Sequence, residues 1–339
     1  INKPDDFIVG VCGFTCFVVC EAAYLDGYKV QFLDIEKDSL NFSFESLKKA
    51  VEKNPKLRII FVQNTLGYPC DIVRISKFCK EKGIILVEDL AHSIGTKYSN
   101  GVEAGNVGDF VMLSFSQDKV IDNVSGGALI VRNSKFKVQS LEIKNVNIRQ
   151  QWKDRRYPLF TFKIRQTYIL GLGKILHVFL KRLNALSNPM SYLGMEEIHS
   201  LPEKYSEEIY NQFLYLEKSI GHRRRVAQLY TEILNKDIFL KTITENIDKS
   251  SNLRLPILVN NREGLISYLK KSGIFISDIW YDSPIGPKKY LQTTNYKIGE
   301  CPNSEYVSER IVNLPTHRTV SNKDTRIIAE KVNECLIKK

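Results

Sequence analysis

The sequence predicts an α/β protein with a mostly parallel central sheet flanked by helices and a smaller C-terminal α+β lobe. In the first half, short β-branched runs alternate with longer segments of helical spacing, as in parallel strands joined by crossover helices. The second half has longer helical patterns and fewer strand-like runs. With 339 residues, 43% of them hydrophobic, the chain is long enough for more than one compact domain.

The first half reads as a repeated strand and helix unit. The expected strands are Phe7–Val11, Tyr28–Leu33, Leu57–Val62, Ile84–Val87, Phe110–Phe115 and Gly127–Val131. The expected helices are Thr15–Asp26, Ser43–Lys53 and Asp71–Lys82, with Gly27 and Gly83 as stops for the first and the last. Ligands of such sheets bind beyond the carboxyl ends of the strands, which makes the residues after Val87 and Leu113 candidates for a site.

In the second half, a helical pattern runs from Leu201 to Asn235. The further elements expected are a strand over Leu253–Val259, a helix over Arg262–Lys271, a strand over Ile274–Ile279 and a helix over Asn322–Ile337. We expect a large α/β domain over 1–150, a basic amphipathic insertion over 151–200 and a small α+β domain over 201–339.

Composition narrows the function classes. The net charge of +11 excludes an acidic solvating protein and favours an anionic partner. The seven cysteines show no zinc or redox spacing, and there is no signal-peptide pattern or membrane-spanning run, so we expect reduced thiols in a cytoplasmic protein. Because the chain starts at Ile1 and enters a strand almost at once, we expect native residues upstream of it.

The stretch 155–195 contains seven basic residues and no acidic one. Apolar residues recur there three or four positions apart, which predicts amphipathic helices. Residues 155–183 could contact an anionic membrane surface, or could form a helix pair between domains or subunits whose basic residues face water. The basic residues lie among aliphatic neighbours and no docking module is readable, so we expect no nucleic-acid partner.

A carboxylate and an imidazole follow one buried strand. Asp89 and His92 come directly after Ile84–Val87 and therefore lie at the carboxyl edge of the predicted sheet. The alternative is that Asp89 caps a short helix while His92 is a hydrogen-bonded, partly buried residue. Ser114 ends the next strand, and Lys119 follows five residues later. A lone lysine is usually a solvated surface cation, but the combination with Asp89 favours a site.

The segment 84–131 resembles the core of the DegT/StrS-type sugar aminotransferases, which are pyridoxal-phosphate enzymes of fold type I in the aspartate aminotransferase superfamily. Further motifs in family order are Phe14-Thr15-Cys16, Gly67-Tyr68-Pro69, Arg223-Arg224-Arg225 and Asn313-Leu314-Pro315-Thr316-His317. The family's phosphate-binding loop would lie upstream of Ile1, and Cys16 stands where an aromatic residue often stacks on the cofactor ring.

The resemblance implies pyridoxal 5'-phosphate as cofactor and a role for each candidate residue. Lys119 would form the internal aldimine, Asp89 would face the pyridine nitrogen, His92 would lie near the ring's 3-oxygen, and Ser114 would bind the phosphate. A carboxylate at the ring nitrogen keeps that nitrogen protonated, so the ring accepts electrons. Once displaced, the Lys119 amine can act as general acid and base. No metal site is expected, since the histidines lack ligand spacing.

The resemblance further implies a homodimeric aminotransferase that moves an amino group from glutamate, through pyridoxamine phosphate, to a keto-sugar, which we expect to be nucleotide-linked. One variant has a lipid-linked sugar at the membrane surface, and another interpretation is a catalytically silent binding or regulatory relative. Dehydratases of the family replace the lysine with histidine, so Lys119 indicates transamination. Tyr281 and His317 could reach the site from the C-terminal lobe, although packing or hydrogen bonding is the expected role of each.

Overall fold

The computed structural model describes residues 7–136, 143–187, 199–276 and 281–337. The chain forms two compact units. The first contains residues 1–113, 129–137 and 216–339, and the second contains residues 114–128 and 138–215. The domain boundaries expected at residues 150 and 200 stay a prediction.

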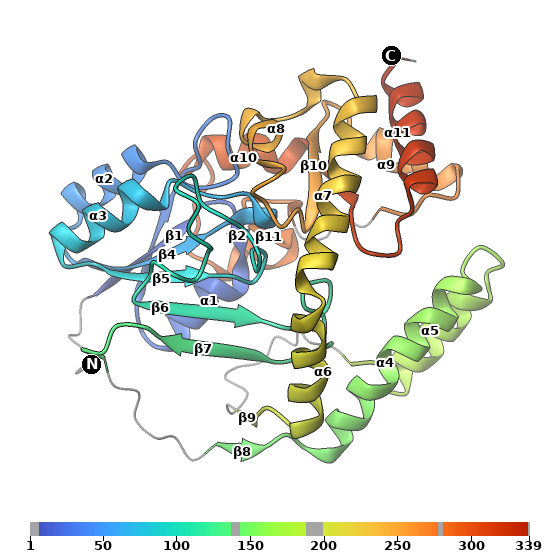
Figure 1. The fold of residues 1–339 in the computed structure, drawn as a ribbon, viewed down its shortest axis with the longest axis horizontal. Coiled ribbons are helices and arrows are strands. Elements are labelled where there is room, and N and C mark those ends of the chain that lie inside the picture. The colour runs from blue at the N-terminus through green and yellow to red at the C-terminus, as the bar shows by residue number, and fades with distance from the viewer. Residues whose placement is uncertain (1–6, 137–142, 188–198, 277–280, 338–339) are drawn as a thin grey trace. The chain divides into compact units, whose positions relative to one another are not determined.

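A six-stranded sheet supplies most of the strands. Its order is β3-β1-β4-β5-β6-β7, and the first five of these strands pair in parallel. The arrow of β7 runs opposite to that of β6 (Figure 1). The bounds are β1 Ile8–Cys12, β3 Lys29–Leu33, β4 Leu57–Gln63, β5 Ile85–Asp89, β6 Phe110–Ser114 and β7 Gly127–Val131. The mostly parallel sheet expected from the sequence is therefore confirmed.

The helices between these strands are α1 Phe17–Leu25, α2 Phe44–Lys53 and α3 Ile72–Lys82, and side-chain caps begin the last two. The side chains of Ser43 and Asp71 each accept a hydrogen bond from the backbone N–H three residues on, so they cap α2 and α3. Gly83 ends α3 with a φ of +63°, a conformation that glycine adopts without strain.

The expected helix Thr15–Asp26 begins two residues late. Thr15–Cys16 instead form the short strand β2, which pairs in parallel with β11, Ile285–Gly286. The partner lies about 270 residues away along the chain, so no local pattern indicates it. The two-residue pairing takes the Thr15 and Cys16 backbone away from the helix.

Residues 216–337 complete the first unit with helices and an antiparallel strand pair, β10 with β12. The bounds are α7 Leu216–Ile233, α8 Lys241–Asn246, β10 Arg254–Leu258, α9 Arg262–Lys271, α10 Pro302–Arg310, β12 Ile311–Pro315 and α11 Asn322–Ile337. The three-ten helices here include η2 Lys236–Ile238 and η4 Lys288–Thr293, and another, η1 Thr65–Gly67, follows β4. Residues 216–337 have the α+β content expected of the C-terminal lobe.

Two expected elements of the second half differ from the structure. The helix expected over 201–235 is interrupted at Tyr215 (φ −105°, ψ 11°), which separates α6, Glu203–Leu214, from α7. The strand expected over Ile274–Ile279 is wrong for residues 274–276, which have no regular structure, and residues 277–279 lie outside the described residues. The apolar run 274–276 does not pair with another strand, and Ile274 and Ile276 pack against the core.

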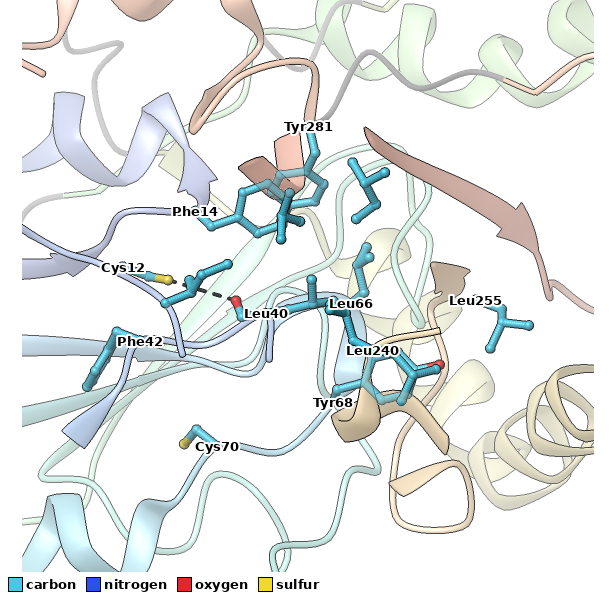
Figure 2. Packing of buried hydrophobic residues seen from close by; sticks show 14 of the residues in the cluster. Cys12, Phe14, Leu40, Phe42, Leu66, Tyr68, Cys70, Leu240, Leu255 and Tyr281 are labelled. Carbon is cyan, nitrogen blue, oxygen red and sulfur yellow. Dashed lines mark hydrogen bonds between the residues drawn. The ribbon is translucent and has the colours of Figure 1, made fainter. Parts of the chain in front are cut away.

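One hydrophobic core joins the sheet of the first unit to its C-terminal helices. Val62 of β4, Tyr230 of α7 and Leu255 of β10 are each fully buried in it. Figure 2 shows Tyr68 and Leu240 in the same cluster, although they come from distant parts of the chain. Burial of apolar surface of this kind is the main favourable contribution to folding.

Glu88, in β5, is a buried carboxylate that holds the loop leading to β6. Its Oε1 accepts hydrogen bonds from the Tyr98 hydroxyl at 2.7 Å and the Gly105 N–H at 2.8 Å. Its Oε2 accepts from the N–H groups of Val107 at 2.8 Å and Gly108 at 2.6 Å. Burial of a carboxylate is tolerated when donors surround it, so these four bonds offset the loss of hydration.

The second unit contains two basic helices, α4 Ile148–Gln166 and α5 Leu172–Arg182, together with α6 (Figure 1). Its short strands β8, Lys144–Asn145, and β9, His199–Ser200, pair in parallel. Gly171 directly precedes α5 and has a φ of +80°, a conformation that glycine adopts without strain. Among the helices that the structure describes, none has the length and apolar character needed to cross a bilayer.

Replacing Glu88 with alanine removes the acceptor of three backbone N–H groups. Each unsatisfied group costs about 1–3 kcal/mol, so we expect the free energy of unfolding in urea to fall by at least about 3 kcal/mol. The control, Glu81→Ala, removes an exposed carboxylate of α3 and should change it by less than about 0.5 kcal/mol. Equal effects of the two substitutions would show that Glu88 does not hold the loop.

Thiol reactivity tests the burial of the cysteines. Burial raises the pKa of the thiols of Cys12 and Cys79 to about 12, and it also raises the pKa of Cys20, Cys70 and Cys301. Cys16 and Cys335 are only partly buried. Because the thiolate is the reactive form, iodoacetamide at about pH 8 should alkylate these two cysteines in the native protein and all seven in denaturant, as read by peptide mass spectrometry. Equally fast native labelling of Cys20 would contradict this.

Candidate active site

The parallel register aligns polar residues at the carboxyl edge of the sheet. Gln63, the last residue of β4, pairs with Asp89, the last residue of β5. Asp89 pairs in turn with Met112 of β6, two residues before Ser114. The ends of three neighbouring strands therefore meet along one edge, which is where ligands of such sheets bind.

Asp89 is a buried acceptor at this edge. Its side chain is 3% exposed, and Oδ1 accepts a hydrogen bond from the N–H of Ala91 at 2.8 Å. Successive residues of a strand point to opposite faces, so Asp89 faces away from the loop that Glu88 holds. This bond closes a local turn and does not cap a helix as the alternative for Asp89 had it, and the turn fixes the direction of the carboxylate.

His92 lies in the same turn and is 5% exposed. The N–H of Leu66 donates to His92 Nδ1 at 3.3 Å. Because a backbone N–H can only donate, Nδ1 is an acceptor, and a neutral ring carries its proton on Nε2. His92 therefore presents an N–H donor on the side away from Leu66. Leu66 makes this bond from a left-handed conformation, with a φ of +55°.

Tyr281 links His92 to Gln63, the last residue of β4, and to Phe14, which follows β1. Its hydroxyl lies 3.3 Å from His92 Nδ1 and 3.4 Å from Gln63 Nε2. Gln63 Oε1 accepts from the Thr15 hydroxyl at 2.5 Å. The Tyr281 ring stacks on Phe14 with centroids 4.5 Å apart, an arrangement that Figure 2 shows.

Burial raises the pKa of Tyr281 well above its ordinary value, and the nearby Asp89 carboxylate acts in the same direction. The phenol therefore stays protonated at neutral pH. As a neutral group it can share the Nδ1 lone pair of His92 with the Leu66 N–H while accepting from Gln63.

In the second unit, Lys119 lies in a closed loop. The Phe115 N–H donates to the Gly126 carbonyl at 2.9 Å, and the Asn123 N–H donates back to Phe115 at 2.8 Å. Within the loop the Asp122 carboxylate accepts from the N–H groups of Asp118 and Val124 at 3.1 and 3.2 Å. Lys119 is 7% exposed, so it is not the solvated surface cation that a lone lysine would usually be.

Ser114 and the glycine pair flank this loop. The Ser114 hydroxyl lies 3.0 Å from that of Ser116, and either can donate. Gly126 has a φ of +114°, and a Cβ atom there would come within 2.8 Å of Leu201 Cδ1. A larger residue at 126 would therefore strain the backbone and collide with the Leu201 side chain, which explains why glycine closes the loop.

The structure brings some of the predicted site residues together within each unit. Asp89, His92 and Tyr281 belong to the first unit, and Ser114 and Lys119 belong to the second. His317 has the hydrogen-bonding role expected for it, since its Nδ1 lies 2.8 Å from the Thr319 hydroxyl.

Sequence reasoning missed Gln63 and Thr15. Gln63 follows the apolar run Leu57–Val62 directly, and this polar strand end is the same signal that identified Asp89 and Ser114. Thr15 offered no such signal because it was assigned to a helix. Its role depends on the strand β2 that only the distant segment Ile285–Gly286 creates.

The residues fit pyridoxal 5'-phosphate in their chemistry. Asp89 supplies a buried carboxylate and His92 a donor at Nε2, which are the types of group that the nitrogen and the oxygen of the cofactor ring need. In the second unit, Gln117 Nε2 is buried without a hydrogen-bond partner among the described residues, so a donor two positions before Lys119 remains for a bound acceptor. In the described ranges no three His, Cys, Asp or Glu side chains form a group that could hold a metal ion.

The chain is similar to enzymes that act on nucleotide-linked sugars. It is 28% identical over 215 residues to GDP-perosamine synthase from Vibrio cholerae, which covers 61% of this chain and 55% of the relative. It is 25% identical over 299 residues to GDP-4-keto-6-deoxy-D-mannose 3-dehydratase from Yersinia pseudotuberculosis, covering 86% of this chain and 70% of the relative. The relatives that this chain resembles in sequence thus include both a synthase and a dehydratase.

Solved structures confirm fold type I. Spr1654 from Streptococcus pneumoniae, described as a sugar aminotransferase, superposes in its PMP form with a TM-score of 0.72 at 18% identity, covering 99% of this chain and 83% of that one. The sequence profile of the DegT/DnrJ/EryC1/StrS aminotransferase family matches residues 1–186 and 209–333, which include the basic helices α4 and α5. The chain therefore belongs to the DegT/DnrJ/EryC1/StrS aminotransferase family.

Proposed function

We propose that this protein is a pyridoxal-phosphate-dependent aminotransferase that transfers an amino group from glutamate to a keto-sugar. The observation that carries the proposal is the burial of Lys119, 7% exposed, in a closed loop that follows the strand paired with β5. Lysines withdrawn from solvent are the ones that serve as Schiff-base residues. The family membership and the strand-end carboxylate Asp89 support the same reaction.

Each candidate residue has a defined task in this proposal. Lys119 would hold the cofactor covalently, Ser114 would donate to its phosphate, and Asp89 would accept from its ring nitrogen. His92 would donate from Nε2 to the ring oxygen, since Nδ1 accepts from the Leu66 N–H. When bound, pyridoxal phosphate supplies an electrophilic carbon and an electron-accepting ring.

The protein's own groups then control proton movement. With the cofactor bound, the Nζ of Lys119 would move a proton from the donor's α-carbon to the cofactor carbon that receives the amine, and in the second half it would move a proton from that carbon to the acceptor sugar. The Asp89 carboxylate would pair with the ring nitrogen and so stabilise charge that develops during proton transfer. The buried network of Tyr281 and Gln63 holds the His92 ring in one orientation.

We propose a nucleotide-linked keto-sugar as acceptor, with the protein acting as a cytoplasmic homodimer. The two GDP-sugar enzymes among the relatives support this substrate class, and the net charge of +11 favours a diphosphate-bearing ligand. The free cysteines agree with a reducing compartment. A lipid-linked sugar carries the same diphosphate and is the variant to compare with it. Within the family, Lys119 favours amino transfer over dehydration.

Replacing Lys119 with alanine should abolish both covalent cofactor binding and amino transfer. Borohydride reduction of the wild-type protein with added pyridoxal phosphate should leave a phosphopyridoxyl group on the peptide that contains Lys119, as read by mass spectrometry. We expect Lys119→Ala to lose this adduct and to slow transfer from glutamate to a panel of keto-sugars by more than about 10³-fold. Lys97→Ala, which removes an exposed lysine near Glu103, is the control and should retain both. A folded wild-type protein that cannot be trapped would favour the catalytically silent interpretation.

Replacing Asp89 with asparagine separates binding from chemistry. Asparagine keeps the size and can still accept from the Ala91 N–H, but it removes the negative charge. We expect the adduct at Lys119 to form as in the wild type while the turnover rate falls by about 100-fold or more, because charge stabilisation is lost. Circular dichroism would verify that the variant is folded. An unchanged turnover rate would mean that Asp89 does not face the ring nitrogen.

A further inference from the structure

The exposed apolar side chains of this protein are concentrated in one helical hairpin. Of the 27 large hydrophobic side chains that are exposed in the described residues, 11 lie within residues 148–183, which comprise α4, α5 and the turn between them. We call this segment the α4–α5 hairpin. Monomeric proteins rarely expose a contiguous apolar surface of such extent unless it binds something.

The hairpin is a well-formed element. Gly173 lies so close to α4 that an added Cβ would collide with the Ile164 carbonyl oxygen, and its N–H donates to the Thr167 carbonyl at 3.0 Å. Asp154 of α4 accepts from the Ser125 hydroxyl at 2.7 Å and the Tyr205 hydroxyl at 3.0 Å, so the hairpin is anchored inside the second unit. Its exposed side chains are therefore displayed by a defined backbone.

One face of α5 presents an apolar stripe. Leu172, Ile175, Phe179 and Leu183 follow each other at spacings of three or four residues, which places them on one side of a helix. They are 60%, 69%, 56% and 60% exposed, whereas Leu180, at another angle, is 7% exposed. The stripe is thus a second apolar face in addition to the one that packs inside the unit.

The charge of the hairpin is almost entirely positive. Residues 148–183 contain nine Lys or Arg residues and a single acidic residue, Asp154, which is 3% exposed and fully engaged in hydrogen bonds. Lys174, Lys181 and Arg182 are exposed on the same helix as the apolar stripe. Apolar and cationic groups are therefore presented together, with no exposed anion among them.

We propose that the α4–α5 hairpin docks on the anionic surface of a lipid membrane, with the apolar stripe of α5 in the interfacial layer and its basic residues on the lipid headgroups. An apolar face with basic residues on the opposite, polar face is the pattern of helices that lie in a membrane interface. A second copy of the hairpin is a poorer occupant, because two such surfaces would bring like charges together. The proposal does not depend on the aminotransferase reaction.

Vesicle binding tests this surface on the full chain without any activity measurement. We expect the wild-type protein to sediment with vesicles of phosphatidylcholine and phosphatidylglycerol at low salt, to be released at high salt, and not to bind phosphatidylcholine alone. The apolar variant is Leu172→Gln with Ile175→Gln and Phe179→Gln. The charge variant is Lys174→Gln with Lys181→Gln and Arg182→Gln. Each should lower the vesicle-bound to free ratio by at least about tenfold.

Matched substitutions outside the hairpin serve as controls. The apolar control is Val73→Gln with Ile298→Gln and Ile327→Gln, all exposed residues of the first unit. The charge control is Lys49→Gln with Lys77→Gln and Lys80→Gln, which changes the net charge equally. Both controls should bind vesicles as the wild type does.

Light scattering during gel filtration, run on every variant, tests whether the hairpin binds a second copy of the chain instead of a membrane. No salt-sensitive binding by the wild type, or equal losses in the hairpin and control variants, would overturn the proposal. Hairpin variants that change the oligomeric state while the wild type ignores vesicles would also overturn it, and would assign this face to contacts between copies of the chain.

Discussion

Two adjacent carboxylates in β5 have opposite tasks because a strand turns successive side chains to opposite faces. Glu88 is enclosed by four donors and holds the loop that leads to β6. Asp89, on the other face, ends the strand at the edge where β4, β5 and β6 meet. A shift of one residue in the pairing of β5 would exchange the two faces, so the loop and the candidate site depend on the same register.

The orientation of His92 depends on groups from several parts of the first unit. Leu66 adopts a left-handed backbone conformation, which costs on the order of 1–2 kcal/mol for a residue with a Cβ. Its N–H occupies Nδ1, and its side chain is 3% exposed in the core. Backbone strain of this kind is often found at functional sites. Tyr281 and Gln63 complete the buried network and limit the ring to one arrangement.

The α4–α5 hairpin differs from the first unit in leaving many of its apolar residues exposed. In the first unit, apolar residues are buried together and the buried carboxylates are surrounded by donors. In the hairpin, apolar residues remain exposed beside basic ones, an arrangement that gains free energy when an anionic apolar interface covers it. If both proposals hold, amino transfer takes place beside a membrane, where a lipid-linked acceptor is as accessible as a nucleotide-linked one.

The amino-acid sequence by itself determined the alternation of strands and helices, since hydrophobic period, capping residues such as Ser43 and Asp71, and stops such as Gly83 act within a few residues. It also placed Asp89, His92 and Ser114 at strand ends. Tertiary structure alone decided that Thr15–Cys16 form a strand, that Lys119 is buried and that Tyr281 joins Gln63, 218 residues away. Such pairings arise from packing between distant segments, and the periodicity of a short segment does not indicate which distant segment will pack against it.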